Sequence, residues 1–266
     1  MKKWGFLLIF IVLLSITVFD IGSFFQGEKD NEMIYQGNLL LVNSLYPVQA
    51  ESIKSDIVNL YERKDLVKGY RLFDRSICLS EEIARKFSDM VLDAEKDGIS
   101  GFLITSGFRE FDEQAALFEE MGPDRALPAG YSEHNLGLSL DVGSIYGKME
   151  VAPEGKWIEE NAWKYGFILR YPKNKTDITG IMNEPWHIRF VGLPHSVIMK
   201  EKDFALEEYL EYLKTEKQIS TTVNGQKYDI LYDSSSKKVT MNAQDNLHYQ
   251  VSGNNSDGII YTIMND

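Results

Sequence analysis

The chain has 266 residues, of which 44% are hydrophobic and 12% aromatic, which suits a packed catalytic domain with a small appendage and not a disordered chain. Its formal net charge of −12 argues against a nucleic-acid partner, because a fold that grips a phosphate backbone carries a basic surface. The single cysteine, Cys78, excludes an intramolecular disulfide and a zinc cluster of thiolates. Its apolar neighbours indicate a small core residue.

The first 25 residues predict a membrane anchor. Lys2 and Lys3 precede an apolar run over residues 4–19, and Asp20 separates this run from a shorter apolar stretch that ends at Phe25. Together they just reach the roughly 20 residues that cross a bilayer. A cleavable signal peptide is the alternative, but no clean pair of small residues marks a cleavage site before Gly27. We therefore expect an uncleaved anchor, with the lysines inside the cell and the rest of the chain outside.

Composition divides the rest of the chain into three parts. Residues 26–37 are polar and charged, as in a short stalk, and residues 38–214 form the expected main domain. Residues 215–266 are rich in Thr, Val, Tyr, Asn and Gly. Short alternating runs there are separated by turn signals such as Asn224-Gly225 and Asp257-Gly258, so a small β module is predicted.

Within the main domain the pattern predicts an α+β fold, a small antiparallel sheet flanked by helices. Residues 39–42 favour a short strand, and residues 80–97 predict the clearest helix, capped by Ser80 and carrying apolar residues at helical spacing. The other predicted strands and helices alternate along the chain: strands over 101–105, 136–142, 166–171 and 186–192, and helices over 110–120, 154–165 and 204–213.

Two of the four histidines lie close in sequence to carboxylates. His134 precedes a predicted strand that carries Asp141 near its end, and a turn at Gly137 would bring both to one edge. Glu184 lies three residues before His187. Histidines with a carboxylate suit a catalytic zinc site that leaves one position open for water, and a nearby glutamate can take the proton of that water.

Each of these residues also has a simpler interpretation. His134 fits a surface hydrogen-bonding residue, Asp141 a turn or cap residue, and 184–187 a loop with a buried tryptophan, so spacing alone leaves the zinc site open. His195, at the start of a predicted helix, and His248, in the β module, are expected to be structural. Glu133 is expected to point away from the site, because neighbours on an extended segment face opposite sides.

Three ordered elements resemble a known family. Ser132-x-His134-x-x-Gly137-x-Ser139-x-Asp141 resembles the Ser-x-His-x-x-Gly-x-Ala-x-Asp signature of VanY-type D-alanyl-D-alanine carboxypeptidases, zinc peptidases related to the Hedgehog signalling domain. Glu184-x-Trp186-His187 resembles the second signature, and Ser106-Gly107-Phe108-Arg109 followed by Gln114 resembles a third element, Ser-Gly-Tyr-Arg and a glutamine. The resemblance spans about residues 38–214 and extends to the anchor and the β tail. Ser139 and Phe108 depart from the pattern, but neither removes a ligand.

The resemblance implies a role for each matched residue. Glu184 is the implied general base and acid, and Arg109 stabilises the oxyanion. Ser132 and Gln114 are implied to help hold the C-terminal carboxylate of the substrate. Trp186 is implied to pack beneath His187. The implied zinc ligands are His134, Asp141 and His187.

The implied substrate is a peptidoglycan stem pentapeptide, or its precursor, ending in D-Ala-D-Ala. Release of the terminal D-alanine would remodel the bacterial cell wall and, in a resistance setting, remove vancomycin targets. The catalytic domain would lie on the extracellular side of the cell membrane. Three alternatives stay open: an L,D-carboxypeptidase, a D,D-dipeptidase, and an inactive wall-binding module, although the base and all three ligands are present.

Overall fold

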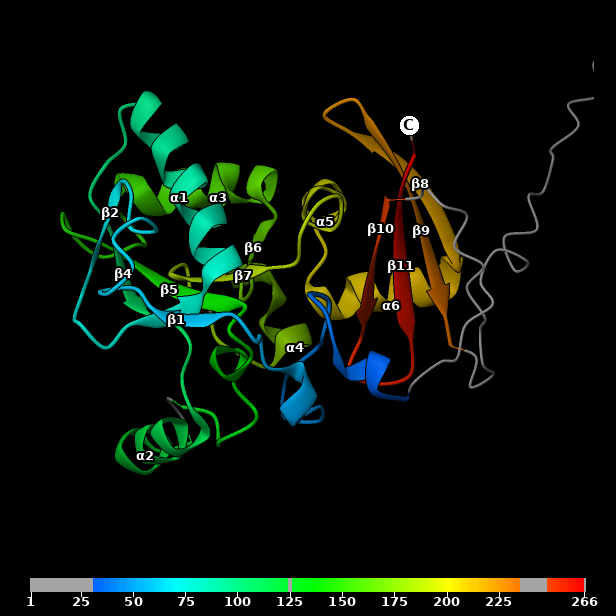
Figure 1. The fold of residues 1–266 in the computed structure, drawn as a ribbon, viewed down its shortest axis with the longest axis horizontal. Helices are drawn as coiled ribbons and strands as arrows, with labels where there is room; N and C mark the ends of the chain where they lie inside the picture. Colours follow the sequence, from blue (N-terminus) through cyan, green and yellow to red (C-terminus); the bar gives the residue numbers. More distant parts are fainter. Residues whose placement is uncertain (1–30, 124–125, 235–247, 266) are drawn as a thin grey trace, which may run out of the picture.

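The computed structural model describes residues 31–123, 126–234 and 248–265 (Figure 1). Within these ranges no helix is long and apolar enough to cross a membrane. The predicted anchor lies outside the described residues. The two largest sheets have five and four strands. Figure 1 shows them side by side, with α5 (His195–Lys202) between them and α6 (Leu206–Glu216) against the four-stranded sheet.

The five-stranded sheet has the order β2-β4-β5-β7-β6. Its strands are β2 (Tyr70–Leu72), β4 (Phe102–Ser106), β5 (Ser139–Ser144), β7 (His187–Phe190) and β6 (Phe167–Leu169). Three pairs are antiparallel, as predicted, but β2 pairs with β4 in parallel. The parallel pair arises because a helical crossover, α1 (Glu81–Lys96), joins the two strands. Two further short strands, β1 (Ile57–Asn59) and β3 (Cys78–Ser80), form a separate pair.

The helices follow their predicted ranges with one interruption. Ser80 accepts a hydrogen bond from the Ile83 amide and caps α1, whose predicted apolar face is buried. The remaining helices of the main domain are α2 (Phe111–Met121), α3 (Pro153–Asn161) and α4 (Thr176–Thr179). The predicted helix over 154–165 tightens into a 3-10 turn at Ala162–Tyr165.

The predicted β module forms an antiparallel sheet of order β10-β11-β9-β8. Its strands are β8 (Gln218–Val223), β9 (Gln226–Asp233), β10 (His248–Gly253) and β11 (Ile259–Asn265). Ile230 and Ile260 share one buried cluster with α5, α6 and Leu39. The predicted boundary after residue 214 therefore runs through a continuous hydrophobic core.

One prediction at the start of the main domain was wrong, and the segment before it has contacts that composition did not predict. Residues 39–42 are buried but form no strand; the Leu41 amide donates to the Asn254 carbonyl instead. The described part of the predicted stalk is packed, since residues 31–35 form a 3-10 helix. The Gly253 amide donates to the Gln36 carbonyl at 2.7 Å. Backbone hydrogen bonds hold this polar segment to the C-terminal sheet, and composition does not reveal them.

Candidate metal centre and active site

Three donor side chains converge at one end of the five-stranded sheet. Asp141 on β5 lies directly opposite His187 on β7, so both side chains face the same side of the sheet. His134 comes from the 3-10 turn η4 (Glu133–Leu136), which leads into β5. Asp141 Oδ2 lies 3.3 Å from His134 Nε2, and Asp141 Oδ1 lies 3.0 Å from His187 Nδ1. One donor atom from each residue lies within 4.8 Å of the others.

In each histidine, the ring nitrogen that faces away from Asp141 has a partner of its own. His134 Nδ1 lies 2.6 Å from the Gly107 carbonyl, which leaves Nε2 for the cluster. A side chain at Gly107 would place its Cβ 2.1 Å from the Cys78 carbonyl, so only glycine allows this backbone approach. His187 Nε2 lies 3.4 Å from a carboxylate oxygen of Glu133, which leaves Nδ1 facing Asp141.

This arrangement fits zinc. Two neutral imidazoles and one carboxylate are a donor set of catalytic zinc sites, which keep a further position open. Metal-ligating histidines usually donate their second N–H to a carbonyl or a carboxylate, and both histidines here have such a partner. His134, Asp141 and His187 are the residues that would hold the ion.

The charges at the centre are strongly coupled. Burial alone would lower the pKa of His187, but the Asp141 and Glu133 carboxylates raise it to about 9. Burial opposes ionisation of Asp141, yet the two histidines hold the pKa of its carboxyl well below the usual range. Without metal, therefore, the two carboxylates favour the protonated form of His187.

Glu184 lies in the turn that leads into β7. The Glu184 amide donates to the Tyr171 carbonyl at 3.0 Å, and the His187 amide donates to the Glu184 carbonyl at 3.1 Å. Burial raises the pKa of the Glu184 carboxyl, and the Asp141 and Glu133 carboxylates add to this shift, while His187 opposes it. A carboxyl with a raised pKa close to a metal centre can both accept and return a proton.

Arg109 is held from two sides. Its guanidinium donates to Gln114 Oε1 at 2.5 Å and to Ser106 Oγ at 2.8 Å. The Arg109 backbone amide also donates to the His134 carbonyl, which links Arg109 to the η4 turn. Burial lowers the pKa of Arg109, and the Asp141 carboxylate opposes that shift.

The two residues expected to hold the substrate carboxylate are both buried. Gln114 is 1% exposed, and its amide nitrogen donates to the Leu127 carbonyl at 2.6 Å. Ser132 caps η4, where its hydroxyl accepts from the His134 amide at 3.4 Å. Gln114 is therefore bonded to Arg109 and Leu127, and Ser132 to the η4 turn.

The expectation for Glu133 was wrong, because the segment is a 3-10 turn and not extended. Glu133 is fully buried and lies between His187 and two arginines, Arg170 and Arg189. Burial would raise the pKa of the Glu133 carboxyl, but the two guanidinium groups hold it below its usual range. Its position next to a predicted ligand was the one signal in the sequence.

The remaining chemically distinctive residues lie away from the centre. His195 begins α5 as predicted and bonds Tyr209 and Thr262 in the core. His248 begins β10 and is exposed. Cys78, predicted as a core residue, is only partly buried.

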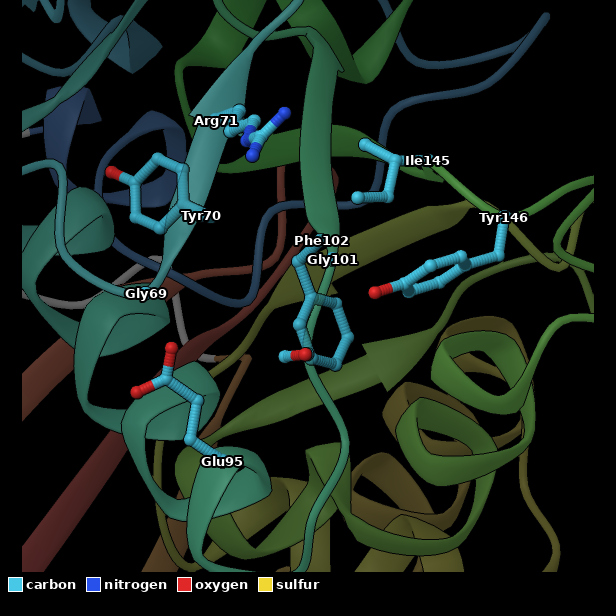
Figure 2. Close-up of a pocket in the computed structure, with 9 residues that line it drawn as sticks. Gly69, Tyr70, Arg71, Glu95, Gly101, Phe102, Ile145 and Tyr146 are labelled. Carbon is cyan, nitrogen blue, oxygen red and sulfur yellow. The ribbon is translucent and has the colours of Figure 1, made fainter.

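A cavity of about 320 Å³ lies at the start of β4, between Tyr70, Glu95 and Tyr146 (Figure 2). Ser106, which contacts Arg109, lies at the other end of the same strand. The two ends of β4 are four residue steps apart, about 13 Å along an extended chain, so this cavity is distinct from the metal centre.

Comparison with known proteins gives concordant matches. The VanY family, described as D-alanyl-D-alanine carboxypeptidase, matches residues 76–193. A D-alanyl-D-alanine carboxypeptidase of Enterococcus faecium is 65% identical over 232 residues, which cover 87% of this chain and 77% of that protein.

Solved structures agree with the sequence matches. The vancomycin-resistance D,D-dipeptidase VanXYg, in complex with a D-Ala-D-Ala phosphinate analog, superposes with a TM-score of 0.77 at 30% identity, over 90% of this chain and 98% of that one. A mutant of the D,D-pentapeptidase VanY from a VanB-type resistance cassette, in complex with Zn(II), gives a TM-score of 0.53 at 27% identity, over 65% and 98% of the two chains. The chain therefore belongs, as its motifs predict, to the VanY family of D-alanyl-D-alanine carboxypeptidases.

Proposed function

We propose that this carboxypeptidase removes the terminal D-alanine from peptidoglycan stem pentapeptides or their precursors, with zinc held by His134, Asp141 and His187. The observation that carries the proposal is the convergence of these three donors within 4.8 Å, with the half-buried Glu184, whose pKa is raised, nearby. When bound, zinc supplies a Lewis acid that polarises the scissile carbonyl and makes water more acidic.

The protein's own groups then move the proton and hold the charge. Glu184 takes a proton from the attacking water as the new C–O bond forms, and returns it to the leaving amine as the C–N bond breaks. Arg109 stabilises the negative charge that develops on the carbonyl oxygen. Ser106 and Gln114 keep the Arg109 guanidinium in place, which reduces the cost of ordering it during the reaction.

Gln114 acts through Arg109 in this proposal, since both ends of its amide are already bonded. The predicted contact of Ser132 with the substrate carboxylate stays a prediction. In the cell wall, removal of terminal D-alanine would also remove vancomycin targets. An L,D-carboxypeptidase and a D,D-dipeptidase remain the rival activities on the same metal centre.

One experiment separates these activities. The purified chain, with zinc and after chelation, is incubated with a pentapeptide ending in D-Ala-D-Ala, with the tetrapeptide product, and with free D-Ala-D-Ala. We expect alanine release from the pentapeptide, lost on chelation and restored by zinc, when products are followed by mass spectrometry. Cleavage of only the tetrapeptide would indicate an L,D-carboxypeptidase, and cleavage of only the dipeptide a D,D-dipeptidase. No cleavage by the zinc-loaded chain would refute the proposal.

Zinc affinity should depend steeply on pH. With the pKa of His187 raised to about 9, zinc must displace a proton at neutral pH. We expect the apparent affinity to rise about tenfold per pH unit between pH 7 and 8 and to level off above pH 9. Competition with a chromophoric chelator, corrected for the chelator's own protonation, measures this; a flat profile would show that His187 is already neutral.

We propose further that residues 1–25 anchor the chain in a bacterial cell membrane, with the catalytic domain outside. Support comes from Lys2 and Lys3 before an apolar run. Removal of residues 1–25 should shift the protein from the membrane to the soluble fraction of cell extracts. External protease should digest the intact protein on protoplasts, and protection of the catalytic domain would contradict this topology.

A further inference from the structure

The Glu133 carboxylate has a partner at every acceptor position. One oxygen, Oε1, accepts from Arg170 Nε at 2.8 Å and from Arg189 Nη1 at 2.6 Å. The other, Oε2, accepts from Ser139 Oγ at 3.1 Å and lies 3.4 Å from His187 Nε2. An ionised carboxylate has about four acceptor sites, so these four partners fix its orientation.

The two oxygens therefore have different roles. The arginines occupy Oε1 and direct Oε2 at the imidazole of His187. Both guanidinium groups are fully buried, as is Glu133, so water does not compete for these bonds. With Oε2 as an acceptor, the proton of neutral His187 lies on Nε2, and the Nδ1 lone pair faces Asp141 at 3.0 Å.

We propose that Glu133 is a positioning residue, which fixes the tautomer and orientation of His187 so that Nδ1 is presented to zinc. This inference rests on the zinc site proposed above. Arg170 and Arg189 hold Glu133 in place, and Ser139, where the family pattern has alanine, adds a bond to the oxygen that receives His187.

The rival explanation is that the network only holds elements together. Arg170 also donates to both carboxylate oxygens of Glu207 on α6, at 2.7 and 2.9 Å. Glu207 thus shares Arg170 with Glu133 but makes no hydrogen bond to His187. Glu207→Gln weakens the ion pair between Arg170 and Glu207 and leaves Glu133 Oε2 in place. It is therefore a matched control.

The test measures zinc affinity, and not activity, of the full chain and its variants by competition with a chelator at fixed pH. We expect Glu133→Gln to bind zinc about 10- to 100-fold more weakly than wild type, and Glu207→Gln to bind it as tightly as wild type. Both variants should unfold at lower denaturant concentration. Unchanged affinity in Glu133→Gln, or equal losses in the two variants, would overturn the inference and leave a purely structural network.

A second measurement on the wild-type chain is independent of how well the variants fold. The chain has only four histidines, so the ¹⁵N-histidine NMR spectrum of the zinc-loaded wild-type protein is simple, and through-bond correlation of each ring with its own backbone assigns it. We expect a proton on Nε2 of His187 and zinc on Nδ1. Zinc on Nε2 would overturn the inference, whereas a wild-type chain that binds no zinc refutes the proposed metal centre itself.

Discussion

Glu184→Gln should lower kcat for D-alanine release by about 100- to 10,000-fold, the range for loss of a general acid–base group. The Glu184 carboxyl interacts electrostatically with His187 and Asp141, and burial raises its pKa, which suits a group that both takes and gives a proton. Glutamine preserves the size of the side chain but can do neither. Steady-state kinetics on the pentapeptide, with product followed by mass spectrometry, measures the loss.

The zinc content of the variant is the control for this result. Because Glu184 is not among the three converging donors, Glu184→Gln should retain zinc in the stoichiometry of wild type. The pH profile should also lose its acidic limb, since that limb reports ionisation of the base. A variant that retains more than a tenth of wild-type kcat would show that another group moves the proton.

The three converging donors were predictable because each lies in a short sequence motif. His134 and Asp141 lie seven residues apart on one turn and its strand, and His187 begins the neighbouring strand. Histidines near a carboxylate suit a zinc site, but their spacing left it open, and the resemblance of the motifs to the VanY family carried the prediction. The pairing of Asp141 with His187 fixes the geometry, and the sequence did not predict which strands pair.

The buried network was not predictable in the same way. Glu133 meets Arg170 and Arg189 across 37 and 56 residues of sequence. Arg189 lies in β7 and Arg170 directly follows β6, and a charged side chain in such a position is usually expected to face solvent. Only the tertiary packing shows that these charges are buried and face one another. The packing of residues 31–37 was missed for a related reason, since backbone hydrogen bonds leave no trace in composition.

Arg189→Met should lower the free energy of unfolding by about 3–5 kcal/mol, the cost of removing one partner from a buried ion pair. The guanidinium is fully buried and, besides Glu133, bonds the carbonyls of Asn38 and Leu40. Methionine fills similar volume but leaves those carbonyls unpaired and Glu133 with one arginine. Denaturant unfolding, analysed with a common m value, measures the loss.

Arg85→Met is the control, because Arg85 forms an exposed pair with Glu81 on α1 and its loss should cost far less. If burial of unpaired charge causes the effect, Arg189→Met combined with Glu133→Gln should be less destabilised than the sum of the two single variants. Additive losses would mean that Arg189 acts through its contacts to the Asn38 and Leu40 carbonyls at the start of the main domain. The double variant thus separates the two functions of this arginine: closing the core against residues 38–40, and holding the carboxylate that orients His187.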